Sequence, residues 1–323
     1  MRRAALSTLF LAFGFTGLWG ASDPRTAGNS LLETADARVT GLSGAATALT
    51  GDLGVAAVNP AALPTLVGAE ASTQFESAPG DVRTGMASFG RGNGRAGWAA
   101  TGLFFDAGKI DVVPLSGPGY TRRAQQDWVG ALTGGIALGE SLRLGVAGKA
   151  LSSTLVRDYH AAVFAGDAGF QWDVSRNLTL GGAVTNAGPK LTYRNQGDPL
   201  PTEYRAGAAV KFALGSGGDE SEDPDSPWYT KIRSDKNYIT VTGDAVADRF
   251  GAVAGAVGLE WDYARRAILR GGMRLGQTGD SFSAGLGFWM KGGRFDYSFQ
   301  AVGDLPDRHR VTVSWFWKKK SEE

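Results

Sequence analysis

From Val67 to Trp317 the chain is a series of segments, each about ten residues long, in which apolar residues alternate with polar or small ones. The segment from Arg294 to Ala301 illustrates this: one side carries Phe295, Tyr297, Phe299 and Ala301, and the other carries Arg294, Asp296, Ser298 and Gln300. An alternation with period two indicates a β-strand, because successive side chains of a strand point to opposite faces. The pattern therefore predicts an all-β chain of long strands.

About fourteen such segments follow one another, with centres near Ser72, Ala87, Thr101, Leu132, Val146, Asp167, Gly181, Ala208, Val241, Ala256, Arg270, Gly285, Ser298 and Ser314. An even number of long alternating strands is typical of a transmembrane β-barrel, whose closure pairs every backbone group. One or two secreted β-sandwiches are the alternative, but sandwich strands are usually shorter, and so many strands rarely come with 48 glycines. We therefore predict a closed antiparallel transmembrane β-barrel of about 14 strands over residues 67–318.

Aromatic residues and turns mark the ends of the predicted strands. The aromatic residues near segment ends, where interfacial belts are expected, are Trp128, Trp172, Trp261, Tyr263 and Trp317. Short turns at 91–94, 139–141, 174–176, 263–265 and 291–293 mark one rim, and longer connections at 106–125 and 188–203 mark the other. In bacterial outer-membrane barrels the short turns are periplasmic, and an even strand number places both termini there as well.

The segment from Gly215 to Lys236 interrupts this pattern. It is strongly acidic between Asp219 and Asp225, and the strand count assigns it to the periplasmic rim. Two explanations stay open at this point: the segment is a periplasmic insertion, or one strand is miscounted.

Two segments precede the predicted barrel. Arg2 and Arg3, the uncharged run Ala4–Leu18 and the small residues after it predict a secretory signal peptide over residues 1–22. Residues 23–66 are apolar and rich in small residues, which predicts a hatch inside a lumen that fourteen strands leave too wide for side chains to fill. A disordered leader is the alternative. The candidate turn of the hatch consists of Asn59, Pro60, Ala61 and Leu63. Residues 319–323 are expected to form a C-terminal tail.

The same residues carry a family resemblance. The stretch Ala35-Asp36-Ala37-Arg38 with Gly41, Gly44 and Ala45, continuing to Asn59-Pro60-Ala61 and Leu63, resembles the N-terminal signature of PorV/PorQ-type outer-membrane proteins. These are related to the FadL-type (OMPP1/FadL/TodX) transport proteins, which share the Asn-Pro-Ala element. Further segments that fit are LRLGVAGKALSS at 142–153, GDAGFQW at 166–172, LTLGGAVTNAG at 178–188, GLEWDYARRAILRGGMRLG at 258–276, GLGF at 285–288, FDYSF at 295–299 and HRVTVSW at 309–315. The resemblance implies a fourteen-stranded barrel with an N-terminal hatch and no enzymatic activity.

Residues that could carry catalysis or hold a cofactor are few. The chain has no cysteine and only two histidines, and it lacks zinc-ligand spacing and nucleotide-binding glycine patterns. Asp158 with His160, or Asp307 with His309, gives at most half of a hydrolytic site. A net charge of +1 gives no electrostatic reason to expect nucleic acid as a partner. We expect no enzyme activity, no cofactor and no metal.

Charged residues on the polar phase of the strands are expected to face the lumen. They are Arg143, Lys149, Arg205, Lys211, Asp244, Glu260, Asp262, Arg270, Arg274, Arg294 and Asp296. They either pair with one another and hold barrel and hatch together, or line a path for an anionic group such as a fatty-acid carboxylate. The mixed signs favour pairing.

Two functions follow from the resemblance. The main prediction is a non-enzymatic protein of the bacterial outer membrane that binds a partner protein in a secretion or surface-assembly system, as PorV-type proteins do. The alternative is a channel for uptake or export of hydrophobic small molecules such as long-chain fatty acids, as in FadL-type proteins. The expected partners are outer-membrane lipid, a protein of a secretion or surface complex and, in the alternative, a hydrophobic ligand. A modest length with few long external loops favours the first function.

Overall fold

The computed structural model describes residues 26–33, 36–78, 81–112, 118–156, 159–214, 237–276, 281–302 and 305–317. The predicted signal peptide (1–22), the acidic residues from Asp219 to Asp225 and the predicted tail (319–323) lie outside the described residues. In the described part of the chain, no helix is long and apolar enough to cross a membrane.

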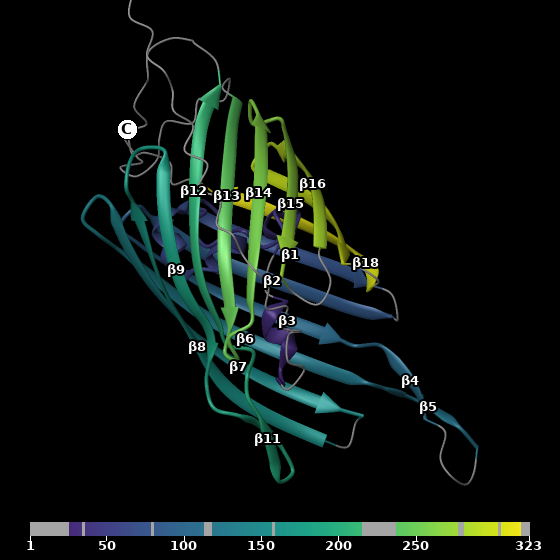
Figure 1. The fold of residues 1–323 in the computed structure, drawn as a ribbon. Coiled ribbons are helices and arrows are strands. Elements are labelled where there is room, and N and C mark those ends of the chain that lie inside the picture. Colours follow the sequence, from purple (N-terminus) through teal and green to yellow (C-terminus); the bar gives the residue numbers. More distant parts are fainter. Residues whose placement is uncertain are drawn as a thin grey trace, which may run out of the picture.

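Fourteen strands close into one antiparallel barrel (Figure 1). The barrel strands are β1 (Val67–Ala78), β2 (Val82–Asn93), β3 (Ala96–Asp106), β6 (Gln125–Leu138), β7 (Leu142–Leu155), β8 (Tyr159–Asp173), β9 (Leu178–Ala187), β12 (Glu203–Leu214), β13 (Asn237–Asp248), β14 (Val253–Tyr263), β15 (Ala267–Leu275), β16 (Ser281–Met290), β17 (Gly293–Val302) and β18 (Leu305–Trp317). Each pairs with its neighbours in chain order, and β1 pairs with β18 to close the ring. The predicted fold class is confirmed, and each of the fourteen expected segment centres falls in a different barrel strand.

Because neighbouring strands run in opposite directions, their connections fall on two rims. One rim carries the short turns at 94–95, 139–141, 174–177, 264–266 and 291–292, together with the start of β1 and the end of β18. Leu214 of β12 pairs with Asn237 of β13 on this same rim. The acidic segment between these two residues is therefore an insertion between paired strands, and the strand count is right.

The opposite rim carries two additional hairpins. Strands β4 (Lys109–Val112) and β5 (Tyr120–Arg123) form a ribbon between β3 and β6 that extends beyond the barrel wall (Figure 1). Strands β10 (Leu191–Tyr193) and β11 (Gln196–Asp198) form the second hairpin, between β9 and β12. These hairpins occupy the two long connections that the sequence predicts.

The two faces of the wall differ as the alternation predicts. On β14, Val257 and Leu259 are exposed on the outside, whereas Ala254 and Ala256 are buried on the inside. The five aromatic residues expected in interfacial belts all lie exposed on the outer face: Trp128, Trp172, Trp261, Tyr263 and Trp317. This outer face is suited to contact with lipid.

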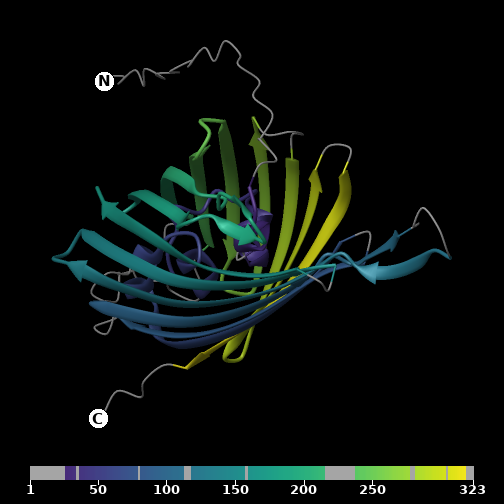
Figure 2. The ribbon, with the colours of Figure 1, turned by 90° about the horizontal axis from the view of Figure 1, so that it is seen from below.

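The N-terminal segment lies inside the barrel (Figure 2). Its helices are short: η1 (Asn29–Leu32), α1 (Ala37–Gly41), α2 (Leu53–Ala56) and η2 (Pro60–Thr65). One buried apolar cluster contains Val39, Leu42, Ala46, Ala48, Leu49, Val55, Val58, Ala62 and, from the wall, Ala209. A second contains Leu53, Ala56, Leu63, Leu66 and Ala99. Residues 36–66 therefore form a packed body, which we call the hatch.

Candidate functional site

Asn59 fixes the turn that ends the hatch. Its backbone is extended (φ −138°, ψ 107°), as expected for a residue before proline, and its Oδ1 accepts a hydrogen bond from the backbone N of Ala61 (3.1 Å). Its Nδ2 donates to the carbonyl oxygen of Thr47 in the hatch (2.7 Å) and to that of Phe170 in β8 (3.0 Å). Because the side chain is fully buried, loss of either bond would leave a polar group without a partner. Asn59 thus connects the hatch to the wall.

The rest of this turn lies directly on inward-facing glycines. A Cβ atom on Gly145 of β7 would lie 2.2 Å from the carbonyl carbon of Pro60 and 2.4 Å from the backbone N of Ala61. A Cβ atom on Gly97 of β3 would lie 2.5 Å from the carbonyl oxygen of Leu63. Since the hatch approaches the wall backbone to backbone, only glycine leaves enough room at these positions.

Two aspartates begin the helices of the hatch. The side chains of Asp36 and Asp52 accept hydrogen bonds from the backbone N of Val39 and of Val55, three residues further on. Burial and the nearby Asp52 carboxylate raise the pKa of Asp36 to about 6. Burial alone would also raise the pKa of Asp52, but two arginine guanidinium groups lower it to about 2. The surroundings therefore stabilise the charged form of the Asp52 carboxyl group and the neutral form of the Asp36 carboxyl group, each relative to the free side chain.

Six charged side chains form a closed ring of alternating sign between hatch and wall. In order round the ring they are Arg38, Glu260, Arg270, Asp296, Arg294 and Asp52, joined by N–O distances of 2.5 to 3.0 Å. The hatch contributes Arg38 and Asp52, and strands β14, β15 and β17 contribute the other four. No side chain of the ring is more than 11% exposed. Removing one member would leave a buried charge without its partner, so the ring holds hatch and wall in register.

Four more of the predicted lumen charges, Arg143, Lys149, Arg205 and Asp244, have close partners. The Arg143 guanidinium bonds both carboxylate oxygens of Asp173 at 2.7 Å, and Lys149 lies 2.8 Å from Asp167. Another ion pair, at 3.1 Å, joins Arg205 and Asp244. The Asp244 carboxylate also accepts hydrogen bonds from the backbone N atoms of Ala46 and Thr47, both at 3.0 Å, so it too binds the hatch.

Within the described part of the chain, the remaining three of the predicted charges have no ionic partner closer than 3.9 Å. The Lys211 ammonium lies 4.7 Å from the centre of the Tyr238 ring. Asp262 accepts hydrogen bonds from a backbone N (2.9 Å) and an indole N (3.3 Å). The Arg274 guanidinium is 3.9 Å from Glu203, and among the described residues its Nε and Nη2 atoms have no hydrogen-bond partner. Pairing is therefore the main arrangement of the lumen charges, with Arg274 as the clearest departure.

A second ion cluster lies near the other end of the lumen, where the sequence analysis named no residue. Arg308 and Arg310 of β18 both contact Glu33, at 2.6 and 2.9 Å, and both contact Glu76 of β1. Burial alone would raise the pKa of Glu33, but the two guanidinium groups lower it below its usual value. The alternation of the last strand could have indicated both arginines, since they share the inward phase of that strand.

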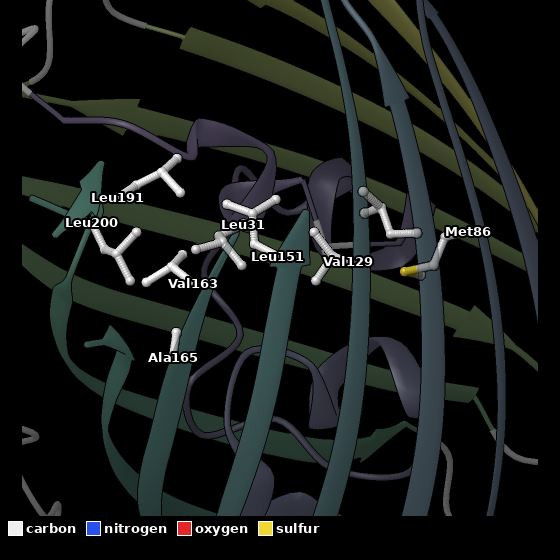
Figure 3. Close-up of a cluster of buried hydrophobic side chains, with 9 residues drawn as sticks. Leu31, Met86, Val129, Leu151, Val163, Ala165, Leu191 and Leu200 are labelled. Atoms are coloured by element: carbon white, nitrogen blue, oxygen red, sulfur yellow. The ribbon is translucent and has the colours of Figure 1, made fainter. Parts of the chain in front are cut away.

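An apolar stripe crosses the inner wall. It runs over five consecutive barrel strands as Met86, Leu103, Val129, Leu151 and Val163, and each of these residues is the direct cross-strand partner of the next. All five are buried, and Figure 3 shows the cluster to which they belong. Five adjoining apolar side chains thus face inward in a lumen that also carries many buried polar and charged side chains.

A lid covers one end of this stripe. It consists of residues 26–33 and of the connection 188–202, which holds the β10–β11 hairpin, and its side chains Leu31, Leu191 and Leu200 pack on the stripe (Figure 3). The two parts of the lid join through a hydrogen bond from the backbone N of Ala27 to the carbonyl oxygen of Pro199 (3.0 Å).

Hydrogen bonds and ion pairs attach the lid to the wall. Ser30 donates to the carboxylate of Asp127 on β6 (2.6 Å), and the Tyr193 hydroxyl donates to the Ser153 hydroxyl on β7 (2.6 Å). Ser153 in turn donates to the same Asp127 carboxylate. The lid is therefore held by a network of neutral donors around one buried carboxylate, together with the ion pairs of Glu33 with Arg308 and Arg310.

No family model and no curated protein matches the sequence. Among solved structures, the fold is similar to the TodX monoaromatic hydrocarbon channel deltaS2 mutant, with a TM-score of 0.54 and 10% identity over 88% of this chain and 97% of that chain. It is similar to the TodX deltaS2S3 mutant, with a TM-score of 0.52 and 11% identity over 87% and 98%. The P. putida toluene transporter TodX gives a TM-score of 0.51 and 10% identity over 87% and 98%.

The chain has the fold of a TodX-type outer-membrane channel. The FadL-like part of the expected resemblance is thereby supported at the level of fold, and the PorV/PorQ part stays a prediction. Bacterial outer-membrane proteins share this barrel architecture.

His160 and His309 lie on the outer face, where their Nδ1 atoms are 2.9 Å from the Thr154 hydroxyl and 2.8 Å from the Tyr297 hydroxyl. Neither histidine faces the lumen. Asp158 lies outside the described residues, and within the described ranges no group of three His, Cys, Asp or Glu side chains could hold a metal ion.

Proposed function

We propose that the protein is an outer-membrane channel for hydrophobic small molecules, in which hatch and lid hold the lumen closed. The observation that carries the proposal is the apolar stripe, because a lumen built only for structural support has no need of five adjoining inward-facing apolar side chains. The similar fold of a monoaromatic hydrocarbon channel supports the same class of ligand, and long-chain fatty acids belong to that class as well.

The arrangement suggests a path with two closures. A ligand that arrives at the rim with the long connections meets the lid first, and it must displace Leu31, Leu191 and Leu200 to reach the stripe. Beyond the stripe the hatch fills the lumen, held by Asn59 and the ring of six charges. Passage requires both bodies to move, and each is attached by a small set of polar contacts that a movement could break.

The proposal includes the orientation in the membrane. The rim with the short turns, both ends of the barrel sequence and the acidic insertion would face the periplasm, and the lid would face the outside. This sidedness is the usual one for bacterial outer-membrane barrels.

A partner protein, which the sequence analysis placed first, becomes the second candidate function. The observation that favours it is the projecting β4–β5 ribbon, where Ile110 and Tyr120 are exposed beyond the barrel wall. The ribbon could contact a protein of a secretion or surface complex without any change in the lumen.

Locking the lid tests the channel. The Ala27→Cys/Pro199→Cys variant puts two thiols at positions whose backbones already touch, within the usual reach of a disulfide, in a chain with no other cysteine. The probes are radiolabelled toluene and oleate, and the host is a Gram-negative strain without a channel of this kind. The wild type should raise uptake above the empty vector, the oxidised double variant should not, and a reductant should restore uptake. The two single-cysteine variants are the controls. Uptake at the vector level for the folded wild type with both probes would show that the protein is not such a channel.

A further inference from the structure

Four buried polar atoms beside the apolar stripe have no hydrogen-bond partner among the residues that the structure describes. They are Nε2 and Oε1 of Gln74, Oγ1 of Thr84 and Oγ of Ser314. The three side chains are at most 3% exposed. Buried polar groups in proteins nearly always have partners, and leaving one without a partner is costly. Such a set therefore points to something that binds there.

The register gathers these side chains on three adjoining strands. Gln74 of β1 pairs with Thr312 of β18 on one side and with Met86 of β2 on the other. Ser314 lies two residues from Thr312, and Thr84 lies two residues from Met86, so both are diagonal neighbours of Gln74 on the inner face. Diagonal neighbours are separated by about 7–8 Å, a span that one small polar group can bridge. Thr84 and Ser314 lie in opposite directions from Gln74, so one group can bridge Gln74 and Thr84, the pair beside Met86, but cannot also reach Ser314.

The polar set also ends the apolar stripe. Met86, the first residue of the stripe, is the direct cross-strand partner of Gln74. From Met86 the stripe continues over four more strands to Val163, a width of about 19 Å at the usual spacing between strands. A polar group at one end of a long apolar row matches the shape of an amphiphile with a short polar head.

The charges nearby indicate that this head is neutral. Glu76 is two residues from Gln74 on the same inner face, and its carboxylate would repel an anion. The arginines beside it already bind Glu76 and Glu33, and the cluster of two arginines and two glutamates has no net charge. A ligand carboxylate would therefore lack a cationic partner among these residues. A ligand hydroxyl, in contrast, can donate a hydrogen bond to Gln74 Oε1 and accept one from Gln74 Nε2 or Thr84 Oγ1.

We propose that Gln74 and Thr84 form a head-group subsite for a neutral alcohol or phenol whose apolar body lies along the stripe. This inference rests on the proposed channel function and deepens it by naming the ligand class. In the closed state the lid leucines cover the far end of the stripe, and the body of the ligand takes their place.

The test is equilibrium dialysis against nanodiscs that contain the full chain, with empty nanodiscs as background. The probes are 4-hexylphenol, hexylbenzene and 4-hexylbenzoate, which share their apolar body and differ only in the head. The wild type should bind the phenol about tenfold more tightly than the hydrocarbon, as expected for one or two added hydrogen bonds, and the benzoate no better than the hydrocarbon.

Two substitutions locate the subsite. Gln74→Leu and Thr84→Val keep the side-chain volume nearly unchanged and remove only atoms without partners, so the barrel should fold, as a heat-modifiable gel shift would show. Each should reduce the preference for the phenol and leave hexylbenzene binding unchanged. Thr242→Val is the matched control, because Thr242 lies on β13, is equally buried and also lacks a partner.

The outcomes separate the two proposals. If the phenol binds no better than hexylbenzene, or if Gln74→Leu and Thr84→Val keep the preference, the polar atoms bind water only and the subsite is wrong, although the channel stands. A preference lost equally in Thr242→Val would also overturn the subsite. If neither hydrocarbon uptake nor hexylbenzene binding is found, it is the proposed function that fails.

Discussion

Gly145 offers a direct way to separate the hatch from the barrel. A Cβ atom at this position would lie 2.2 Å from the carbonyl carbon of Pro60 and 2.5 Å from its carbonyl oxygen, so Gly145→Ala drives a methyl group into the hatch backbone. The backbone cannot rotate away as a side chain could, and Asn59 holds the turn against β8. Gly148 is the matched control, because it lies on the same strand, faces outward and has no atom within 4 Å of the added Cβ.

The magnitude follows from the cost of overpacking. Inserting one methyl group into a tightly packed contact costs about 1–3 kcal/mol, and here the cost falls on the docked hatch rather than on the barrel strands. The undocked population should therefore rise about 5- to 150-fold in Gly145→Ala. Gly148→Ala should leave this population unchanged.

Planar bilayers provide the assay. Gly145→Ala should show frequent conductance steps, wild type and Gly148→Ala few, and a deletion of residues 38–63 gives the fully open reference. A heat-modifiable gel shift shows that each barrel is folded. If folded Gly145→Ala conducts no more than Gly148→Ala while the deletion conducts strongly, the close contact between Pro60 and the wall does not hold the hatch. If even the deletion conducts no more than the wild type, residues 38–63 do not plug the lumen.

Three further predictions concern the membrane faces, the pH and the sidedness. Leu259→Arg places a charge on the lipid-facing side and should lower the free energy of unfolding by about 2–4 kcal/mol if the residue is near the midplane, whereas Ala256→Arg points inward and should affect folding in the membrane less. Heat-modifiable gels compare the two variants, and a reversed order of stability would contradict the assigned faces. The pKa of Asp36 is about 6 in the docked hatch, whereas the usual value of an aspartate is 3.8, so the docked hatch keeps a proton that the undocked hatch releases. Docking should therefore weaken as the pH rises through 6, and conductance should be higher at pH 7.5 than at pH 5. The Asp36→Asn variant, which can still cap the helix, should remove this difference. A Ser221→Cys variant, in the acidic insertion, should react with an impermeant maleimide only after cell lysis, and labelling of intact cells would place that rim outside.

The strands could be predicted from the sequence because the membrane and the interior select side chains separately. On β14, Leu259 faces lipid and Glu260 faces the ring of charges, and one residue of shift would exchange them. The sequence of each strand therefore predicts which of its residues face inward. The connections could be predicted too, since the turn near Gly139 and the long connection that holds β10 and β11 differ clearly in length in the sequence.

The hatch contacts could not be predicted in the same way. Arg38 bonds Glu260, a residue 222 positions away, and no local pattern relates the two. The helices of the hatch have only four to six residues, too short for a helical period to appear in the sequence. The turn at Asn59 and Pro60 was found from a local signal, and the N-cap positions of Asp36 and Asp52 are similar signals that would have located α1 and α2. The lid was missed for a related reason, because Leu191 and Leu200 lie in a connection without alternation.

The alternation shows which residues face inward, but it does not show what they meet. Thr312 and Gln74 are direct cross-strand partners on the inner face, but the Thr312 hydroxyl accepts a hydrogen bond from the backbone N of Ala37, while the Gln74 side chain has no hydrogen-bond partner among the described residues. The difference is made by a short body of chain folded into the lumen, so function in a barrel of this kind depends on how that body fits the wall. Wall positions that the hatch contacts tightly should control closure of the lumen. Wall side chains that neither hatch nor lid provides with hydrogen-bond partners are where a ligand can be recognised.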